Sequence, residues 1–476
     1  MIKSRLTLFV SMLFIAGCNS SSTDSDVILS SPTDPIMYAD SGNTTTKSFT
    51  VTLDANSNAI MSLGATSSYN VTISGLEAPF TVSENNCSSL TTTDSCSFRV
   101  SYSPTDSSQQ NISDTFNVAV VDHGSANYTI MGKAGLNVVI FGDSLSDGGY
   151  QDNLIATSGW PTIPDTSTLK SPTFTTPIEG GGVWAGYLDD YSGSTIKINN
   201  TDPVISSSTT SGNLDGSNYA AGGATTTCTG ITSSSSGTVI YSPPPIGPQR
   251  ADATACADSS IQNHNQIDNY LNTNGDKANA DSIYIIWGGA NNLFKGQALG
   301  EDESQLQQTM IDAAKDIAYD VDYLYDKGGR KFIVLNLPNI GATPSVTEDG
   351  GSPDSDSALA ATALSELYNS TLITELDSLS ASLDGINIKQ IDSFTLLDRI
   401  ISDKNYSVLG ADFGFDNTTQ MACTYNADDM PSAINCIPDD GKLSGYLFED
   451  GVHPTTEMHE ALAYTIFKEI EQLEQD

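Results

Sequence analysis

The stretch LNVVIFGDSLSDGG, residues 136–149, begins as an apolar run and ends in small and acidic residues. Such a run is typical of a buried strand in a parallel sheet, and Gly, Asp and Ser commonly form the turn into the helix that follows. A second interpretation is that Ser144 is a nucleophile held at the carboxyl end of that strand. The choice depends on whether the rest of the chain supplies a base, an orienting carboxylate and donors for an oxyanion.

Segments of two kinds alternate from residue 136 to the C-terminus. Three more apolar runs resemble the first, and other segments carry apolar residues at three- and four-residue spacing. The runs are 282–287, 331–337 and 386–391, and the helical segments are 304–328, 357–379 and 455–475. This alternation predicts an α/β domain with a central parallel sheet covered by helices on both faces. Ligands of such sheets bind beyond the carboxyl ends of the strands, so chemistry is expected in the turns there.

One of the four histidines lies in such a turn, in FEDGVHPT at 448–455. Asp450 precedes His453 by three residues, a spacing that in a tight turn brings the carboxylate to Nδ1 of the imidazole and leaves Nε2 facing Ser144. The alternative is that Asp450 only ends a loop ahead of the last helix. The other histidines are expected to be an exposed turn residue, an exposed residue among amides and a residue on a helix face: His123, His264 and His459.

Two further turns contain candidate donors for an oxyanion. Gly223 lies in SNYAAGGATT at 217–226, where a Gly-Gly pair lets the backbone approach closely, and Asn291 lies in GGANNLF at 288–294. Together with the backbone N–H of Ser144, the Gly223 N–H and the Asn291 amide would form three donors. The alternative for each segment is a turn or a flexible loop with no chemistry.

The charge of the chain is strongly unbalanced. Its 476 residues include 19 Lys and Arg against 58 Asp and Glu, a net charge of −39. This balance argues against binding nucleic acid or anionic lipid through charge, and it favours solvation and colloidal stability. Calcium binding along the acidic segment 348–356 is an alternative, but the segment lacks EF-hand spacing.

The N-terminus, MIKSRLTLFVSMLFIAGC, has the pattern of an export signal. Two basic residues precede an apolar segment that is too short to span a bilayer. The tetrapeptide Ile15-Ala16-Gly17-Cys18 resembles a bacterial lipobox, which implies removal of residues 1–17 and acylation of Cys18. Asn19 then favours the outer membrane, so we expect a lipoprotein of the bacterial cell envelope on its periplasmic or surface face. The alternative is a plain signal peptide with an incidental cysteine.

The remaining six of the seven cysteines form three pairs that are local in sequence. An even number behind an export signal predicts disulfides in an oxidising compartment. The pairs are Cys87–Cys96, Cys228–Cys256 and Cys423–Cys436. None of them has zinc-ligand spacing, so no metal site is expected.

The region between the signal and residue 136 divides into two parts. Residues 18–35 are rich in Ser, Thr and Asp and are predicted to be a flexible tether. Residues 36–135 contain short runs with alternating polarity, which predict a small all-β sandwich. The Cys-x-Phe-x-Val-x-Tyr strand that starts at Cys96 resembles immunoglobulin-like modules of bacterial surface proteins. This domain has no catalytic constellation, and a spacer role is favoured over glycan binding.

Four ordered blocks together resemble the SGNH hydrolases, in their GDSL esterase/lipase branch. The blocks are GDSLSD with Ser144, NYAAGGA with Gly223 or, in another register, Gly222, then Gly289-Ala290-Asn291-Asn292, and Asp450-Gly-Val-His453-Pro. The stretches 181–188 and 334–344 resemble the family as well. Over residues 136–476 the resemblance implies a three-layer, flavodoxin-like α/β fold. Asn292 departs from the family pattern, which has a supporting Asp there, and the absence of Gly-x-Ser-x-Gly at Ser144 argues against the α/β-hydrolase branch.

The resemblance also implies a mechanism without a metal or an organic cofactor. Ser144 would attack an ester carbonyl, His453 would carry the proton, and Asp450 would stabilise the imidazolium. Ser144 N–H, Gly223 N–H and Asn291 Nδ2 would stabilise the oxyanion. Lipid esters such as lysophospholipids, acetylated carbohydrates and choline esters all remain open, although the absence of a long apolar lid favours short or water-soluble esters. The alternative function is a cell-surface adhesin that uses the hydrolase fold as a scaffold.

Overall fold

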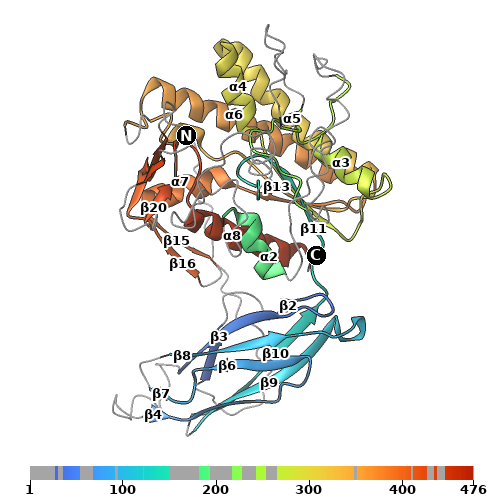
Figure 1. Ribbon diagram of the computed structural model, residues 1–476, viewed down its shortest axis with the longest axis vertical. Coiled ribbons are helices and arrows are strands. Elements are labelled where there is room, and N and C mark those ends of the chain that lie inside the picture. Colours follow the sequence, from blue (N-terminus) through green and yellow to red (C-terminus); the bar gives the residue numbers. More distant parts are fainter. Residues whose placement is uncertain are drawn as a thin grey trace, which may run out of the picture.

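The structure is a computed structural model, in which a β domain packs beneath a larger α/β domain (Figure 1). It describes residues 27–30, 36–53, 68–91, 95–121, 123–148, 182–192, 217–227, 243–252, 265–347, 351–408, 411–425, 434–436 and 445–474. The predicted signal peptide over 1–17 lies outside these residues, as do His264 and three of the predicted modification sites, Cys18, Cys228 and Cys256.

Two four-stranded sheets form the N-terminal β domain, in the orders β1-β3-β8-β6 and β2-β10-β9-β5. The first contains β1 (Val27–Ser30), β3 (Thr45–Leu53), β8 (Cys96–Tyr102) and β6 (Phe80–Asn85). The second contains β2 (Ile36–Tyr38), β10 (Gly124–Lys133), β9 (Ile112–Val120) and β5 (Val71–Ser74). The short strands β4 (Ser68–Tyr69) and β7 (Leu90–Thr91) pair with each other, and η2 (Ser107–Gln109) is a 3-10 helix.

Aromatic side chains fill the space between these two sheets. The ring of Phe49 lies 5.3 Å from that of Phe98 in its own sheet and 5.8 Å from that of Phe116 in the other sheet, measured between centroids. All three side chains are almost completely buried, as the alternating pattern of the strands requires. The contact confirms the all-β sandwich predicted ahead of the α/β domain. A disulfide between Cys87 and Cys96 closes the loop before β8, as predicted.

Two expectations for this domain were wrong. The predicted tether ends earlier, because Val27–Ser30 forms β1 and pairs antiparallel with β3, which lets the apolar Val27 enter the core. His123 is buried instead of exposed, with 3% of its surface accessible. Its ring lies edge-on to Tyr69 at a centroid distance of 4.4 Å, so an aromatic contact between distant segments explains the burial.

A four-stranded parallel sheet forms the centre of the α/β domain, in the order β11-β12-β13-β14. Its strands are β11 (Val138–Gly142), β12 (Ile283–Trp287), β13 (Lys331–Leu335) and β14 (Asn387–Ile391). They coincide with the four apolar runs, and β11 and β12 are buried along their whole length. On the open side of β11, Ile140 forms a parallel bridge with Asn218.

Helices cover both faces of this sheet and make three layers (Figure 1). One face packs against α3 (Gln266–Thr273), α4 (Ala290–Leu299), α5 (Glu303–Asp326) and α6 (Asp356–Ser382), and the other packs against α2 (Trp184–Ser192) and α8 (Thr456–Leu473). The predicted helical segments correspond to α5, α6 and α8. A capping box between Asp302 and Gln305 fixes the start of α5. These layers confirm the predicted α/β fold.

Short elements complete the chain between β14 and α8. They are α7 (Ser393–Asp403) and the pairs β15 (Asn405–Val408) with β16 (Ala411–Gly414), β17 (Asn417–Met421) with β20 (Tyr446–Phe448), and β18 (Cys423–Tyr425) with β19 (Ile434–Cys436). A 3-10 helix, η3 (Ile340–Ala342), follows β13. Cys423 is disulfide-bonded and is the register partner of Cys436 across β18 and β19, in agreement with the predicted pairing.

The two domains contact each other through the start of the sandwich and helix α8. The ring of Tyr38 packs edge-on against Phe467 at 6.1 Å. The ammonium group of Lys47 lies 3.9 Å from the carboxylate of Glu471 and donates a 2.7 Å hydrogen bond to the carbonyl oxygen of Ile36. These contacts attach the sandwich to the helix that follows His453.

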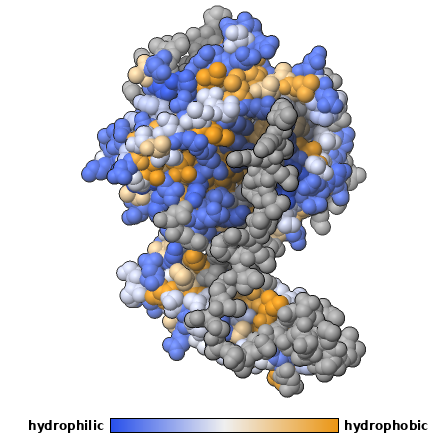
Figure 2. All heavy atoms as spheres, turned by 180° about the vertical axis from the view of Figure 1, so that it is seen from behind, coloured by the Kyte–Doolittle hydropathy of each residue, from blue (hydrophilic) through white to orange (hydrophobic). Residues whose placement is uncertain are grey.

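On the face shown in Figure 2, hydrophobic residues form separate patches among hydrophilic ones, as the acidic composition leads one to expect. Within the described ranges, every helix is too short or too polar to cross a membrane.

Asp320 differs from the solvent-exposed acidic residues because its carboxyl group is buried. It lies on α5 with no exposed surface, and neither carboxylate oxygen has a hydrogen-bond partner in the described part of the chain. Gly247 packs directly against it, where any Cβ would collide with the carboxylate. Burial, followed by the charges of Asp316 and Asp268, raises the pKa of Asp320 well above its usual value.

We therefore predict that Asp320→Asn stabilises the protein in a pH-dependent way. As the pH rises from about 4, the unfolded chain releases this proton while the folded chain retains it, so the wild type loses stability. The variant avoids that loss and should exceed the wild type by about 1–3 kcal/mol at pH 8, with a smaller difference at pH 4. Urea unfolding at both pH values measures this, with Asp326→Asn, an exposed position on the same helix, as the control. A difference independent of pH would contradict the prediction.

Candidate active site

Ser144 lies in the tight turn that follows β11. A Cβ on Gly142 would come within 2.7 Å of the carbonyl oxygen of Trp287, so only glycine allows β11 to end this close to β12. The turn is held by Asp143, whose carboxylate accepts the backbone N–H of Leu145 at 3.1 Å and whose carbonyl accepts that of Ser146 at 3.0 Å. Ser144 is left half-buried at the carboxyl end of the sheet.

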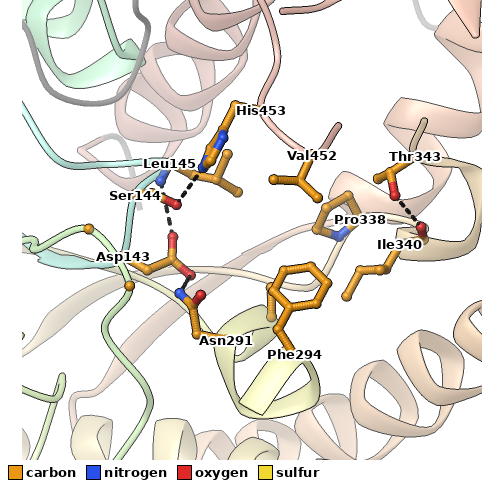
Figure 3. A pocket seen from close by; sticks show the side chains of 13 residues that line it. Asp143, Ser144, Leu145, Asn291, Phe294, Pro338, Ile340, Thr343, Val452 and His453 are labelled. Carbon is orange, nitrogen blue, oxygen red and sulfur yellow. Dashed lines mark hydrogen bonds between the residues drawn. The ribbon is translucent and has the colours of Figure 1, made fainter. Parts of the chain in front are cut away.

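Asp450 and His453 come from the turn after β20 and meet Ser144 there (Figure 3). Nε2 of His453 lies 2.9 Å from Oγ of Ser144, and Nδ1 lies 2.7 Å from Oδ2 of Asp450. The other carboxylate oxygen of Asp450 accepts the backbone N–H groups of Val452 at 2.8 Å and of His453 at 2.6 Å. The structure thus brings together the three residues that the sequence singled out, with the carboxylate fixed by its own turn.

The electrostatics of this trio keep Asp450 ionised and His453 basic. Burial lowers the pKa of His453, but the hydrogen bond and charge of Asp450 outweigh it, so the pKa lies above 6.5. Burial likewise raises the pKa of Asp450, and its hydrogen bonds with His453 and Val452 more than reverse this, so its pKa falls below 3.8. A neutral imidazole that faces a hydroxyl, with a carboxylate behind it, is suited to accept a proton.

The backbone N–H of Gly223 is better placed as a donor than that of Gly222. Gly222 donates its N–H to Oδ2 of the buried Asp147 at 2.7 Å, whereas the N–H of Gly223 has no partner among the described residues. Gly223 has a φ of +81°, a conformation that favours glycine, and it lines the pocket beside Ser144. The geometry therefore selects Gly223 between the two registers.

Asn291 lies on the first turn of α4 and faces the same pocket. Its Nδ2 donates to the carbonyl oxygen of Ala224 at 3.0 Å and lies 3.4 Å from Oδ2 of Asp143. The amide carries two hydrogens, so one can donate to Ala224 while the other faces Asp143. All three predicted donors are thus grouped around one pocket.

Asp143 is a residue to which the sequence assigned only a turn. Its side chain is buried, and burial raises its pKa to about 6 against the opposing effects of the Leu145 N–H and the charge of His453. Its position between a buried strand and Ser144 was the available signal. The long-range contact with Asn291, which gives it a place in the site, has no signature in the local sequence.

A cavity of about 250 Å³ opens beside Ser144. Figure 3 shows the wall opposite Ser144, where apolar side chains come from three separate segments. Phe294 comes from α4, Pro338 and Ile340 from the segment that leads from β13 into η3, and Val452 from the turn that contains His453. The pocket therefore has a polar side with the donors and an apolar side that suits a hydrocarbon group.

A three-layer α/β fold with a serine, histidine and aspartate at the carboxyl edge of its sheet has the architecture of a hydrolase. The chain belongs to the GDSL-like lipase/acylhydrolase family, whose family model matches residues 138–466. This range includes every residue of the site and leaves out the sandwich. Family membership supports ester hydrolysis as the general class of activity.

Several plant relatives are similar to parts of the chain. GDSL esterase/lipase EXL3 of Arabidopsis thaliana is 30% identical over 38% of this chain and 50% of its own length. GDSL esterase/lipase At4g16230 of the same plant is 25% identical over 66% of this chain and 82% of its own. Another Arabidopsis relative, named inactive GDSL esterase/lipase-like protein 25, is 26% identical over 37% of this chain and 41% of its own. The chain spans half or less of the length of EXL3 and of this inactive relative.

Among solved structures, a member of the lipolytic protein G-D-S-L family from Veillonella parvula aligns with 71% of this chain and 97% of its own. Its sequence identity is 15% and its TM-score is 0.29. A score this low carries no argument about the site.

The opposite environments of two histidines give a direct test of the electrostatics. We predict that His453 titrates above pH 6.5, while His459, buried in α8 and near the charge of His453, titrates at about pH 3. Asp450→Asn should lower the pKa of His453, because the hydrogen bond and charge that oppose the effect of burial are then lost, and it should leave the pKa of His459 unchanged. NMR titration of the imidazole resonances, assigned with single histidine variants, measures both. A pKa of His453 that does not respond to Asp450→Asn would refute this account.

Proposed function

We propose that this protein hydrolyses carboxylic esters through a covalent acyl-enzyme on Ser144. The observation that carries the proposal is the continuous chain of hydrogen bonds from Asp450 through His453 to Ser144, at distances of 2.7 and 2.9 Å. His453 would accept the proton of Ser144 as its Oγ attacks the ester carbonyl, and would then donate it to the leaving alcohol. Water would release the acyl group by the same steps, with His453 again as the base.

Negative charge would develop on the carbonyl oxygen, on the side of the pocket that holds Gly223 and Asn291. The N–H groups of Ser144 and Gly223 and one hydrogen of the Asn291 amide would donate to it. These donors are neutral, and their positions are fixed before the substrate arrives. Preformed donors of this kind are the usual source of a large part of the rate enhancement in acyl transfer.

The size of the cavity favours a short acyl chain. At about 250 Å³ it is smaller than the roughly 300–1,000 Å³ typical of pockets for drug-sized ligands. Phe294 and Val452 would contact the acyl group, while the alcohol would leave toward solvent. Esters of short acids on a soluble alcohol, including acetylated carbohydrates, fit this pocket better than long-chain lipids or lysophospholipids.

For the location, we propose a lipoprotein of the bacterial cell envelope, anchored through Cys18. The lipobox-like sequence and the oxidised Cys87–Cys96 pair support this placement. The sandwich would act as a spacer. Its exposed large hydrophobic side chains in the described ranges are aliphatic, namely Ile28, Val121 and Met131, whereas glycan binding commonly uses exposed aromatic rings.

The first test is hydrolysis of p-nitrophenyl esters from acetate to palmitate. We expect the highest kcat/KM with short chains, and a loss of about 10³-fold or more in Ser144→Ala, because the nucleophile is absent. Ser370→Ala, an exposed position on α6, serves as the control. If the wild type is inert and an active-site serine probe also fails to label folded protein, the adhesin alternative replaces the enzyme, as the existence of an inactive relative allows.

A second test addresses the apolar wall. Phe294→Ala should move the preferred acyl chain toward greater length, with roughly a 10-fold change in the ratio of octanoate to acetate kcat/KM, because the substitution deepens the pocket. Leu299→Ala is the matched control, since it truncates a side chain of the same helix that is 59% exposed. An unchanged preference in a folded Phe294→Ala protein would show that the acyl group lies elsewhere.

A further inference from the structure

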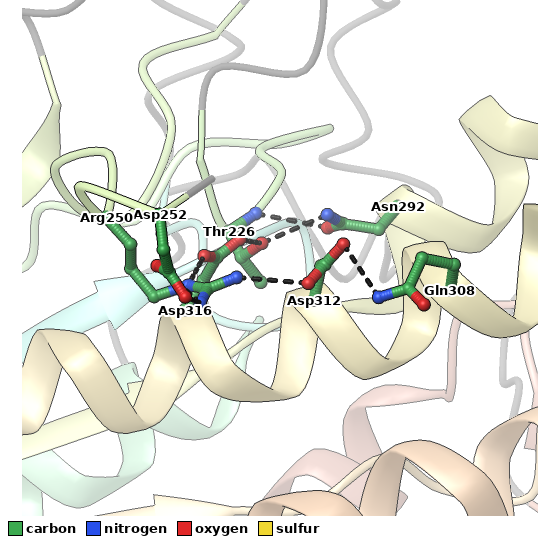
Figure 4. Close-up of polar contacts among 7 residues, drawn as sticks. All are labelled: Thr226, Arg250, Asp252, Asn292, Gln308, Asp312 and Asp316. Carbon is green, nitrogen blue, oxygen red and sulfur yellow. Dashed lines mark hydrogen bonds and ion pairs between the residues drawn. The ribbon is translucent and has the colours of Figure 1, made fainter. Parts of the chain in front are cut away.

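A buried polar network joins α4, α5 and the loop that follows Gly223 (Figure 4). It runs from Asn292 on α4 through Thr226, in the loop that follows Gly223, to Asp316 on α5 and to Arg250. The accessible surface of these four residues is 3%, 0%, 3% and 9%, in that order. Buried polar groups must satisfy one another, so the arrangement of hydrogens in this network is strongly constrained.

Two adjacent asparagines on α4 form hydrogen bonds with the loop that contains Gly223, Ala224 and Thr226. Asn291 donates to the carbonyl oxygen of Ala224 at 3.0 Å. Asn292 accepts the backbone N–H of Thr226 at 3.1 Å and donates to its hydroxyl oxygen at 3.0 Å. One proposed oxyanion donor, Gly223, lies on the loop, and the other, Asn291, lies on the helix. These three hydrogen bonds therefore determine the separation of the two donors.

The hydroxyl of Thr226 gives the network a direction. It has one hydrogen, which it donates to Oδ2 of Asp316 at 3.0 Å, and it accepts from Nδ2 of Asn292. Residue 292 must therefore supply a donor, and residue 316 must supply an acceptor. An aspartate at 292 would place a carboxylate oxygen against the hydroxyl oxygen of Thr226, whose one hydrogen is already donated to Asp316.

Arg250 fixes the acceptor end. Its Nε donates to Oδ1 of Asp316 at 2.6 Å, and its other nitrogens lie 2.9 Å from Asp252 and 3.1 Å from Asp312. One guanidinium thus already faces three carboxylates. A fourth carboxylate at position 292 would add a buried negative charge without a further cation.

We propose that Asn292 is a positioning residue, which sets the separation of the Gly223 and Asn291 donors through a hydrogen-bond chain that requires one amide and one carboxylate at positions 292 and 316, so that the carboxylate of Asp316 requires an amide at 292. The inference rests on the proposed ester hydrolysis, since it concerns donors for that reaction. It explains why this chain has asparagine at a position where a resemblance to the family leads one to expect aspartate. It also makes Asp316, which lies outside the pocket lining, a determinant of catalytic rate.

The test exchanges the two side chains. Asn292→Asp breaks the hydrogen-bond chain at Thr226. We expect kcat to fall about 10- to 100-fold with KM changed less than about threefold, because a displaced oxyanion donor weakens stabilisation of the transition state more than substrate binding. Asp316→Asn should lower kcat as well, since two amides then face one hydroxyl. The double variant Asn292→Asp/Asp316→Asn restores a continuous chain with the opposite direction. In it, the amide introduced at position 316 donates to the hydroxyl of Thr226, and that hydroxyl donates to the carboxylate introduced at position 292.

We expect the double variant to recover most of the kcat lost in Asn292→Asp, at least 5-fold. A parallel comparison uses Thr226→Val, which removes the hydroxyl, and Thr226→Ser, which retains it and should regain most of the activity that Thr226→Val loses. All variants of the full chain are assayed with p-nitrophenyl butyrate well below their Tm. The rate at which a fluorophosphonate labels Ser144 is measured in parallel, because that reaction also places charge on an oxygen near the same donors.

The outcomes separate this inference from the proposed function. Suppose that the wild type is active. The positioning role alone is then overturned if the kcat of the double variant is no higher than that of either single variant, or if Asn292→Asp keeps full kcat. Loss confined to Tm, with kcat and the labelling rate unchanged, overturns it too. A wild type that hydrolyses no ester but is labelled at Ser144 contradicts the general substrate, and the labelling rates then decide the positioning role. A wild type that is neither active nor labelled overturns both.

Discussion

Three backbone hydrogen bonds on the open side of β11 decide where the site forms. They join Ile140 and Gly142 to residues 217–221, with N–O distances of 2.8–3.1 Å, and so place the Gly223 loop beside the turn that contains Ser144. Side chains reinforce the joint, because Asn218 donates to the carbonyl oxygen of Ser146 at 2.8 Å and Asp147 accepts the N–H of Gly222. Ser144 and Gly223 are therefore positioned by one edge of one strand.

His453 reaches the same edge from a different part of the chain. The parallel pairing of β17 with β20 ends at Phe448, and the turn after it is closed by hydrogen bonds from the N–H of Glu449 to the carbonyl oxygen of His453 and from that of Thr455 to Leu447. Because Asp450 accepts two N–H groups of its own turn, the orientation of the carboxylate is set locally and does not depend on the imidazole. Only the Nε2–Oγ contact depends on tertiary packing.

This division explains what the sequence allowed us to predict. The parallel strands, the main helices and the residues Ser144, Asp450 and His453 follow from local patterns, since each lies in a strand, a helix or a turn with its own signature. The burial of His123, the pairing of β1 and the network from Asn292 to Arg250 do not. The contacts of that network join residues separated by 66 to 90 positions, and complementary hydrogen-bond donors and acceptors at such distances leave no periodicity to detect.

The charge around the site constrains how an oxyanion can be stabilised there. Asp143 and Asp450 both lie within hydrogen-bonding distance of groups in the proposed reaction, and Arg250 is already surrounded by acidic side chains. A cation near the substrate would pair with these carboxylates, so neutral donors are the arrangement that remains available. Asp143 then has opposing effects, because its oxygen orients Asn291 while its negative charge would oppose the oxyanion. Burial raises the pKa of Asp143 to about 6, so the carboxyl becomes neutral, and this opposition is lost, only as the pH falls below that value.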